Sequence, residues 1–153
     1  MFGKTLNAGQ ICLAPDYVVV HKDQKYDFIN ETKNAVSDYF PDLKDNDDYT
    51  SIINQNHYDR LQDLLNDAVE KGATIDEINP ANEDFSQQEH FKIPPTIVSN
   101  TTDDMKIMQE EIFGPLLPVV EYDEIDEATK LINSKDRPLG LYYFGNDLSL
   151  IHI

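Results

Sequence analysis

A single cysteine is the one thiol in this 153-residue chain that could act as a nucleophile. Cys12 directly follows a glycine-containing stretch, residues 7–11, that reads Asn-Ala-Gly-Gln-Ile. A catalytic thiol must ionise, and its thiolate needs a base, a helix terminus or a cation nearby. Lys4 is the only cation near Cys12 in the sequence, so any other activating group must come from elsewhere. Because cysteine is also a common small buried residue, its type alone leaves a structural role open.

Two adjacent carboxylates form the second candidate site. Glu110 and Glu111 precede Phe113 and a Gly-Pro pair. Taken alone, this pattern is typical of a helix end and a loop with both glutamates in solvent. The four histidines lie far apart and show no metal-ligand spacing, so no metal site is predicted. They are His21, His57, His90 and His152.

Strands and helices alternate around these two sites. Strands are expected near residues 17–20, 74–75, 94–98, 116–120 and 141–144, helices over 28–40, 58–69 and 125–132, and a short helix or turn over 105–111. The continuous apolar run at 17–20 predicts a strand buried on both faces, as in a parallel sheet. Pro118 predicts an edge strand or a bulge. The alternation predicts an α/β fold, with an open, mostly parallel sheet flanked by helices.

Composition narrows the function classes. The formal net charge is −17, and no basic stripe is present, so binding to nucleic acid or to an anionic membrane is disfavoured. One cysteine permits no internal disulfide, which favours a reducing cytoplasm. No apolar run reaches the roughly 18 residues of a membrane span.

The two chemical motifs together resemble the active-site signatures of the aldehyde dehydrogenase superfamily. The upstream motif is Asn-Ala-Gly-Gln-Ile-Cys and the downstream motif is Glu-Glu-Ile-Phe-Gly-Pro, in the family's order. The resemblance extends from Phe2 to about Asp147. Cys-Leu-Ala-Pro-Asp-Tyr and Leu-Tyr-Tyr-Phe are most similar to the coniferyl-aldehyde and fatty-aldehyde branch, which is class 3-like.

This resemblance implies a role for each matching residue. Cys12 is the nucleophile that attacks an aldehyde, and its backbone N–H is one oxyanion donor. Glu111 hydrogen-bonds the nicotinamide ribose of NAD or NADP, and Phe113 packs near the nicotinamide ring. Gly114 and Pro115 shape the turn that presents both. The implied reaction oxidises an aldehyde to a carboxylic acid through a thiohemiacetal and a thioester.

Other positions in the two motifs are expected to be structural. Asn7, Gly9 and Gln10 shape the backbone around Cys12, and Glu110 is structural or solvated. The general base, the second oxyanion donor and the glycine-rich dinucleotide region of the family are missing from the chain. Residues 1–147 are therefore expected to be a partial catalytic domain, inactive alone, of a cytoplasmic and homo-oligomeric parent enzyme. Residues 148–153 are expected to be a foreign tail.

Two other functions stay open at this point. The first is a non-catalytic interaction module that keeps the same fold. The second is a thiol hydrolase without a cofactor, which would require a histidine beside Cys12. No histidine lies near Cys12 in the sequence, but the fold could bring one close.

Overall fold

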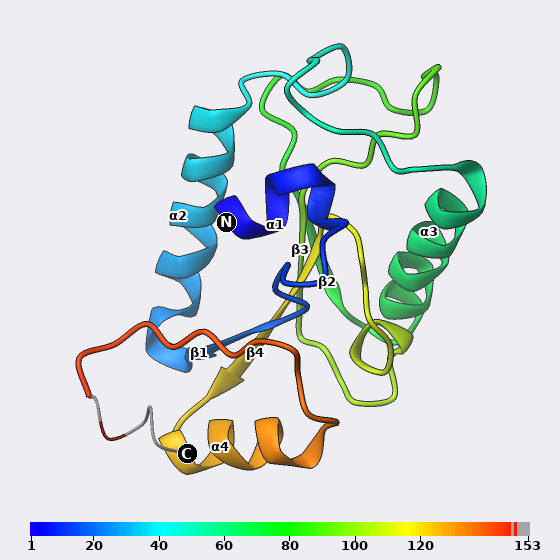
Figure 1. The fold of residues 1–153 in the computed structure, drawn as a ribbon. Coiled ribbons are helices and arrows are strands. Elements are labelled where there is room, and N and C mark those ends of the chain that lie inside the picture. Colours follow the sequence, from blue (N-terminus) through cyan, green and yellow to red (C-terminus); the bar gives the residue numbers. More distant parts are fainter. Residues whose placement is uncertain (148, 150–153) are drawn as a thin grey trace.

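A four-stranded sheet forms the centre of the chain, for which a computed structural model describes residues 1–147 and 149. The strands are β1 (Val18–His21), β2 (Thr74–Glu77), β3 (Thr96–Ser99) and β4 (Leu116–Tyr122). Their spatial order is β1-β4-β3-β2 (Figure 1). β4 runs parallel to both β1 and β3, and only β2 is antiparallel to its neighbour. The predicted open, mostly parallel α/β sheet is confirmed.

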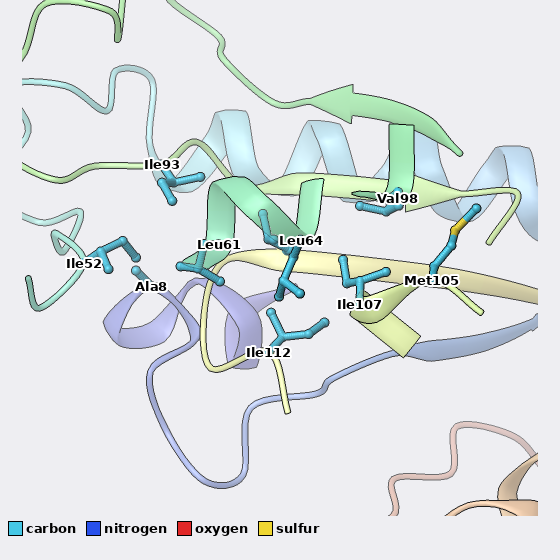
Figure 2. Close-up of a cluster of buried hydrophobic side chains, with 11 residues drawn as sticks. Ala8, Ile52, Leu61, Leu64, Ile93, Val98, Met105, Ile107 and Ile112 are labelled. Carbon is cyan, nitrogen blue, oxygen red and sulfur yellow. The ribbon is translucent and has the colours of Figure 1, made fainter. Parts of the chain in front are cut away.

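Two long helices cover opposite faces of this sheet. α2 (Lys25–Tyr39) and α3 (Gln55–Glu70) flank the strands (Figure 1). Successive strand residues point to opposite faces, so Ile97 packs with α2 while Val98 packs with α3. The α3 side holds the larger apolar cluster (Figure 2). Its buried members are Ala8, Ile52, Leu61, Leu64, Ala68, Ile93, Val98, Met105, Ile107, Ile112 and Leu116.

The helix positions follow from local signals in the sequence. α2, α3 and α4 (Ile125–Ser134) confirm the three predicted helices. α2 ends two residues before Pro41, which cannot continue a helix. Gly72 follows α3 with a φ of 93°, as a C-terminal cap requires. The remaining turns are short: α1 (Phe2–Thr5) and the 3₁₀ segments η1 (Leu6–Gly9), η2 (Lys22–Gln24) and η3 (Lys106–Met108), the last within the expected 105–111 turn.

Two expectations about strand environment were wrong. β4, which contains Pro118, pairs on both sides in a one-to-one register, so it is neither an edge strand nor bulged. Its first four residues are all buried, and this packing outweighs the loss of one ladder donor. β1 is half-buried along its whole length, because it lies at the edge of the described sheet.

The predicted strand at residues 141–144 is also wrong. The segment after α4 is irregular and lies outside the sheet (Figure 1). Phe144 is 92% exposed, and the hydroxyl of Tyr142 donates to the carbonyl of Leu13 at 3.3 Å. An extended segment becomes a strand only when a neighbouring strand pairs with it, and none of the described strands does so.

The expected foreign tail cannot be compared with the structure. Apart from Ser149, residues 148–153 lie outside the described part of the chain. Among the described residues, every helix is too short or too polar to span a bilayer.

Two buried lysines make opposite contributions to stability. The side chain of Lys92 is buried, and its Nζ donates to the carbonyls of Leu43 (3.0 Å) and Asn46 (2.6 Å). Lys4 is 1% exposed, and among the described residues its Nζ has no hydrogen-bond partner. Burial lowers the pKa of Lys4 from 10.5 to about 8, while the charge of Asp16 opposes this shift. A buried ammonium without a partner is costly.

Replacing Lys4 with methionine is therefore expected to stabilise the chain at pH 7. Below pH 8 both folded and unfolded Lys4 are charged, so the folded state carries the full penalty of about 3 kcal/mol. Between about pH 8 and 10.5 the unfolded state binds more protons, so the stability of the unsubstituted chain rises with pH. Urea unfolding at pH 7 and pH 10 should show a gain for Lys4→Met that shrinks at the higher pH. Lys92→Met is the matched control and should lose stability. A gain of equal size at both pH values would contradict this account.

Candidate active site

Cys12 lies in an exposed turn whose entry is unusually curled. Asn7, Ala8 and Gly9 have φ values of 51°, 51° and 73°, three successive residues in the left-handed region. Glycine adopts this conformation freely and asparagine tolerates it, whereas Ala8 does so at a cost. Ala8 is fully buried in the apolar cluster around α3, which offsets that cost (Figure 2).

Gln10 fastens this turn to the segment that precedes α3. Its side-chain nitrogen donates to the carbonyls of Asn7 (3.1 Å) and Ser51 (3.0 Å). Its side-chain oxygen accepts from the backbone N–H of Ile53 at 2.9 Å. The structural role expected for Gln10 is consistent with these contacts, which hold the backbone two residues before Cys12.

The two motifs predicted from the sequence meet in the fold. Gly9 packs directly on the backbone of Gly114, and a Cβ added at Gly9 would lie 2.7 Å from the carbonyl carbon of Gly114. On the other side of Cys12, an oxygen of Asp16 accepts from the backbone N–H of Ile112 at 3.0 Å. The turn that carries Cys12 is thus joined, before and after the cysteine, to the segment that carries Glu111 and Phe113.

Segment 111–113 is anchored through its middle residue. Ile112 is fully buried in the apolar cluster on the α3 side of the sheet (Figure 2). Glu111 is exposed and Phe113 is half-buried. Phe113 has a φ of 50°, which is rare for a large aromatic residue and indicates that its surroundings impose the conformation.

Two residues of α3 that the sequence analysis did not select bind this segment. His57 and Arg60 lie three residues apart and so share one face of the helix. His57 Nε2 donates to the carbonyl of Phe113 at 2.7 Å, and Arg60 donates to the carbonyls of Glu111 (3.3 Å) and Ile112. Arg60 also pairs with the carboxylate of Glu110 at 2.9 Å, which agrees with a structural role for Glu110.

The engagement of His57 bears on the hydrolase alternative. The carbonyl of Phe113 only accepts, so Nε2 carries the proton. Nδ1 then accepts from Arg60 Nε at 3.3 Å. Both ring nitrogens are occupied in this arrangement, so His57 offers no free base to Cys12.

Comparison with known proteins establishes the family. Residues 1–152 match the sequence pattern of the family described as "Aldehyde dehydrogenase family". The chain belongs to the aldehyde dehydrogenase family. Aldehyde dehydrogenases act on aldehyde substrates, and the family assignment confirms the resemblance seen in the sequence.

Curated aldehyde dehydrogenases that resemble this chain support the expected branch. A probable coniferyl aldehyde dehydrogenase of Caulobacter vibrioides is 60% identical over 147 residues, which are 96% of this chain and 30% of that protein. Mouse aldehyde dehydrogenase family 3 member A2 is 36% identical over 152 residues, covering 98% of this chain and 29% of that protein. The chain therefore spans about 30% of the length of the curated relatives it matches.

Solved aldehyde dehydrogenase structures share the fold. The substrate-bound AldH of Staphylococcus aureus superposes with a TM-score of 0.84 at 37% identity, over 99% of this chain and 31% of that one. An NADP-dependent glyceraldehyde-3-phosphate dehydrogenase from Bacillus halodurans, complexed with NADP, gives a TM-score of 0.71 at 27% identity. That match covers 88% of this chain and 27% of the other.

Proposed function

We propose that this chain supplies the nucleophile and part of the cofactor site of an enzyme that oxidises an aldehyde to a carboxylic acid with NAD or NADP. The observation that carries the proposal is the double join between the turn of Cys12 and segment 111–113. The nucleophile and the cofactor-binding segment must be held close together so that the substrate attached to the nucleophile can react with the bound cofactor. Family membership and the NADP complex of a structural relative support the same chemistry.

Cys12 would carry the covalent chemistry. Its thiolate adds to the carbonyl carbon of the aldehyde and forms a thiohemiacetal, whose oxygen bears the developing negative charge. Loss of hydride leaves a thioester on Cys12, and water releases the carboxylic acid and regenerates the thiol. Cys12 is exposed, so a substrate can reach it. Its backbone N–H makes no hydrogen bond to another described residue, which leaves this donor for the oxyanion.

Glu111 and Phe113 would hold the cofactor. An exposed carboxylate accepts hydrogen bonds from ribose hydroxyls, and charge strengthens such bonds. The ring of Phe113 offers an apolar contact for the flat nicotinamide. NAD or NADP, when bound, supplies the hydride acceptor. The residue types and the fixed backbone of this segment fit such a group.

The remaining catalytic groups would come from the part of the aldehyde dehydrogenase sequence that this chain does not cover. The general base, the second oxyanion donor and the phosphate-binding region belong there, so the chain alone is expected to lack turnover. The complete enzyme would be cytoplasmic and homo-oligomeric. Residues 1–147 would form part of its catalytic domain.

Thiol labelling separates this enzyme from the interaction-module alternative. Exposure alone lets Cys12 react with iodoacetamide at the rate of a free thiol, whereas an activated thiolate should react at least about tenfold faster than glutathione at the same pH. In the complete enzyme, Cys12 should be labelled at least about tenfold faster than glutathione, as measured by mass spectrometry. An aldehyde substrate should slow this labelling in a saturable manner. Labelling at the glutathione rate, without protection by any aldehyde, would favour the interaction module.

A further inference from the structure

The carbonyl groups of segment 111–113 all face the first turns of α3. Three consecutive residues direct their carbonyl oxygens at two side chains: Glu111 and Ile112 at Arg60, and Phe113 at His57. A regular strand or helix does not turn three successive carbonyls to one side-chain pair. The left-handed φ of Phe113 permits this curl.

The helix end that bears these side chains is itself fixed. Asn54 caps α3, and its side-chain oxygen accepts from the backbone N–H of His57 at 2.9 Å. Leu61, next to Arg60, is fully buried against the strands. His57 also stacks edge-on against Phe113, with ring centroids 6.2 Å apart. The start of α3 therefore fixes the position of segment 111–113 through hydrogen bonds and one aromatic contact.

We infer that His57 and Arg60 are positioning residues for cofactor binding, which they serve through the backbone of segment 111–113. This inference rests on the proposed function. The two side chains engage main-chain carbonyls, Glu110 and one side of the Phe113 ring, so the carboxylate of Glu111 is left for the cofactor. Without these bonds, segment 111–113 keeps its buried anchor Ile112 but loses the constraint on the residues to either side.

The test measures the dissociation constant of NAD and NADP in the complete enzyme. His57→Phe keeps an aromatic ring against Phe113 but removes the hydrogen bond, and it should weaken cofactor binding about tenfold, the effect of one lost hydrogen bond. The KM for the aldehyde should stay within about twofold, because the turn of Cys12 keeps its own contacts. His57→Gln can donate to Phe113 and accept from Arg60, so it should restore most of the affinity.

Controls separate positioning from a merely structural role. Arg60→Lys keeps a positive charge near Glu110 but replaces three separate nitrogens, which bond His57, Glu111 and Ile112, with a single one, so it should weaken cofactor binding as His57→Phe does. Asp59→Asn, on the exposed side of the same turn, should change nothing; the carboxylate of Asp59 accepts from Gln55. His57 and Arg60 lie at the partly exposed end of α3, so their variants should fold.

Each outcome decides a different question. Folded His57→Phe and Arg60→Lys with an unchanged cofactor dissociation constant would overturn the inference, as would a failure of His57→Gln to restore affinity. Failure of the unsubstituted enzyme to bind either NAD or NADP would instead overturn the proposed function.

Discussion

Replacing Cys12 with serine is expected to abolish aldehyde oxidation in the complete enzyme and to leave cofactor binding unchanged. A serine hydroxyl is a far weaker nucleophile at neutral pH, because almost none of it is ionised. Activity should fall at least about a thousandfold. Cys12 is exposed, so exchanging its sulfur for oxygen disturbs no packed core. The measurement is the rate of NADH or NADPH formation, with the cofactor dissociation constant determined in parallel.

The matched comparison is His21→Phe, at the end of β1 and outside the two joined motifs. His21 accepts from the N–H of Asp23 at 3.3 Å and stacks on Tyr122, so its loss should alter the local turn and not the rate. Dehydrogenase activity that survives Cys12→Ser would rule out Cys12 as the nucleophile. Loss of activity together with loss of cofactor affinity would point to a structural defect.

Replacing Gly9 with alanine is expected to separate the two motifs. The new methyl group would overlap the carbonyl group of Gly114, and main-chain atoms cannot turn aside as a flexible side chain does. The left-handed φ of 73° adds strain for any residue with a Cβ. The free energy of unfolding should fall by about 4 kcal/mol. Urea unfolding of the chain measures the stability, and aldehyde oxidation by the complete enzyme should fall with it.

Substitutions at two other glycines separate the steric from the conformational part of this loss. Gly72 has a φ of 93° and nothing within 4 Å of an added Cβ, so Gly72→Ala should show the conformational cost alone, about 1 kcal/mol. Gly3 lies in α1 with only an ordinary 3.5 Å contact to Pro15, so Gly3→Ala should be neutral or slightly stabilising. A loss at Gly9 no larger than that at Gly72 would show that the close approach to Gly114 carries little energy.

Local signals in the sequence were enough to place most elements of the fold. The apolar stripe of α3 and the glycine after it gave that helix, and the β-branched run at 17–20 gave β1. The wrong predictions concern which strands pair with one another. Pro118 lies in a central strand because burial of β4 outweighs one missing donor, and the apolar residues 141–144 stay irregular because no described strand pairs with them. Strand pairing depends on distant segments, which local periodicity does not describe.

The candidate site shows the same limit. Resemblance to a family selected Cys12, Glu111 and Phe113, and these assignments stay predictions until the variants are measured. The contacts of His57 and Arg60 were missed because their acceptors are backbone carbonyls. Every residue carries a carbonyl, so such a contact leaves no mark on the acceptor's side chain. A histidine and an arginine spaced i, i+3 near a capped helix start was the one available signal.

The contact between Gly9 and Gly114 has a consequence for how this protein can diverge. It is made by main-chain atoms and depends on the absence of a side chain at Gly9, whereas a Cβ at Gly114 would meet the side chain of Leu61. Ile11 and Leu13, which flank Cys12, take no part in this contact. Ile11 is half-buried and Leu13 is exposed. Mutations at these two positions can therefore accumulate while the geometry inherited around the sulfur stays constant.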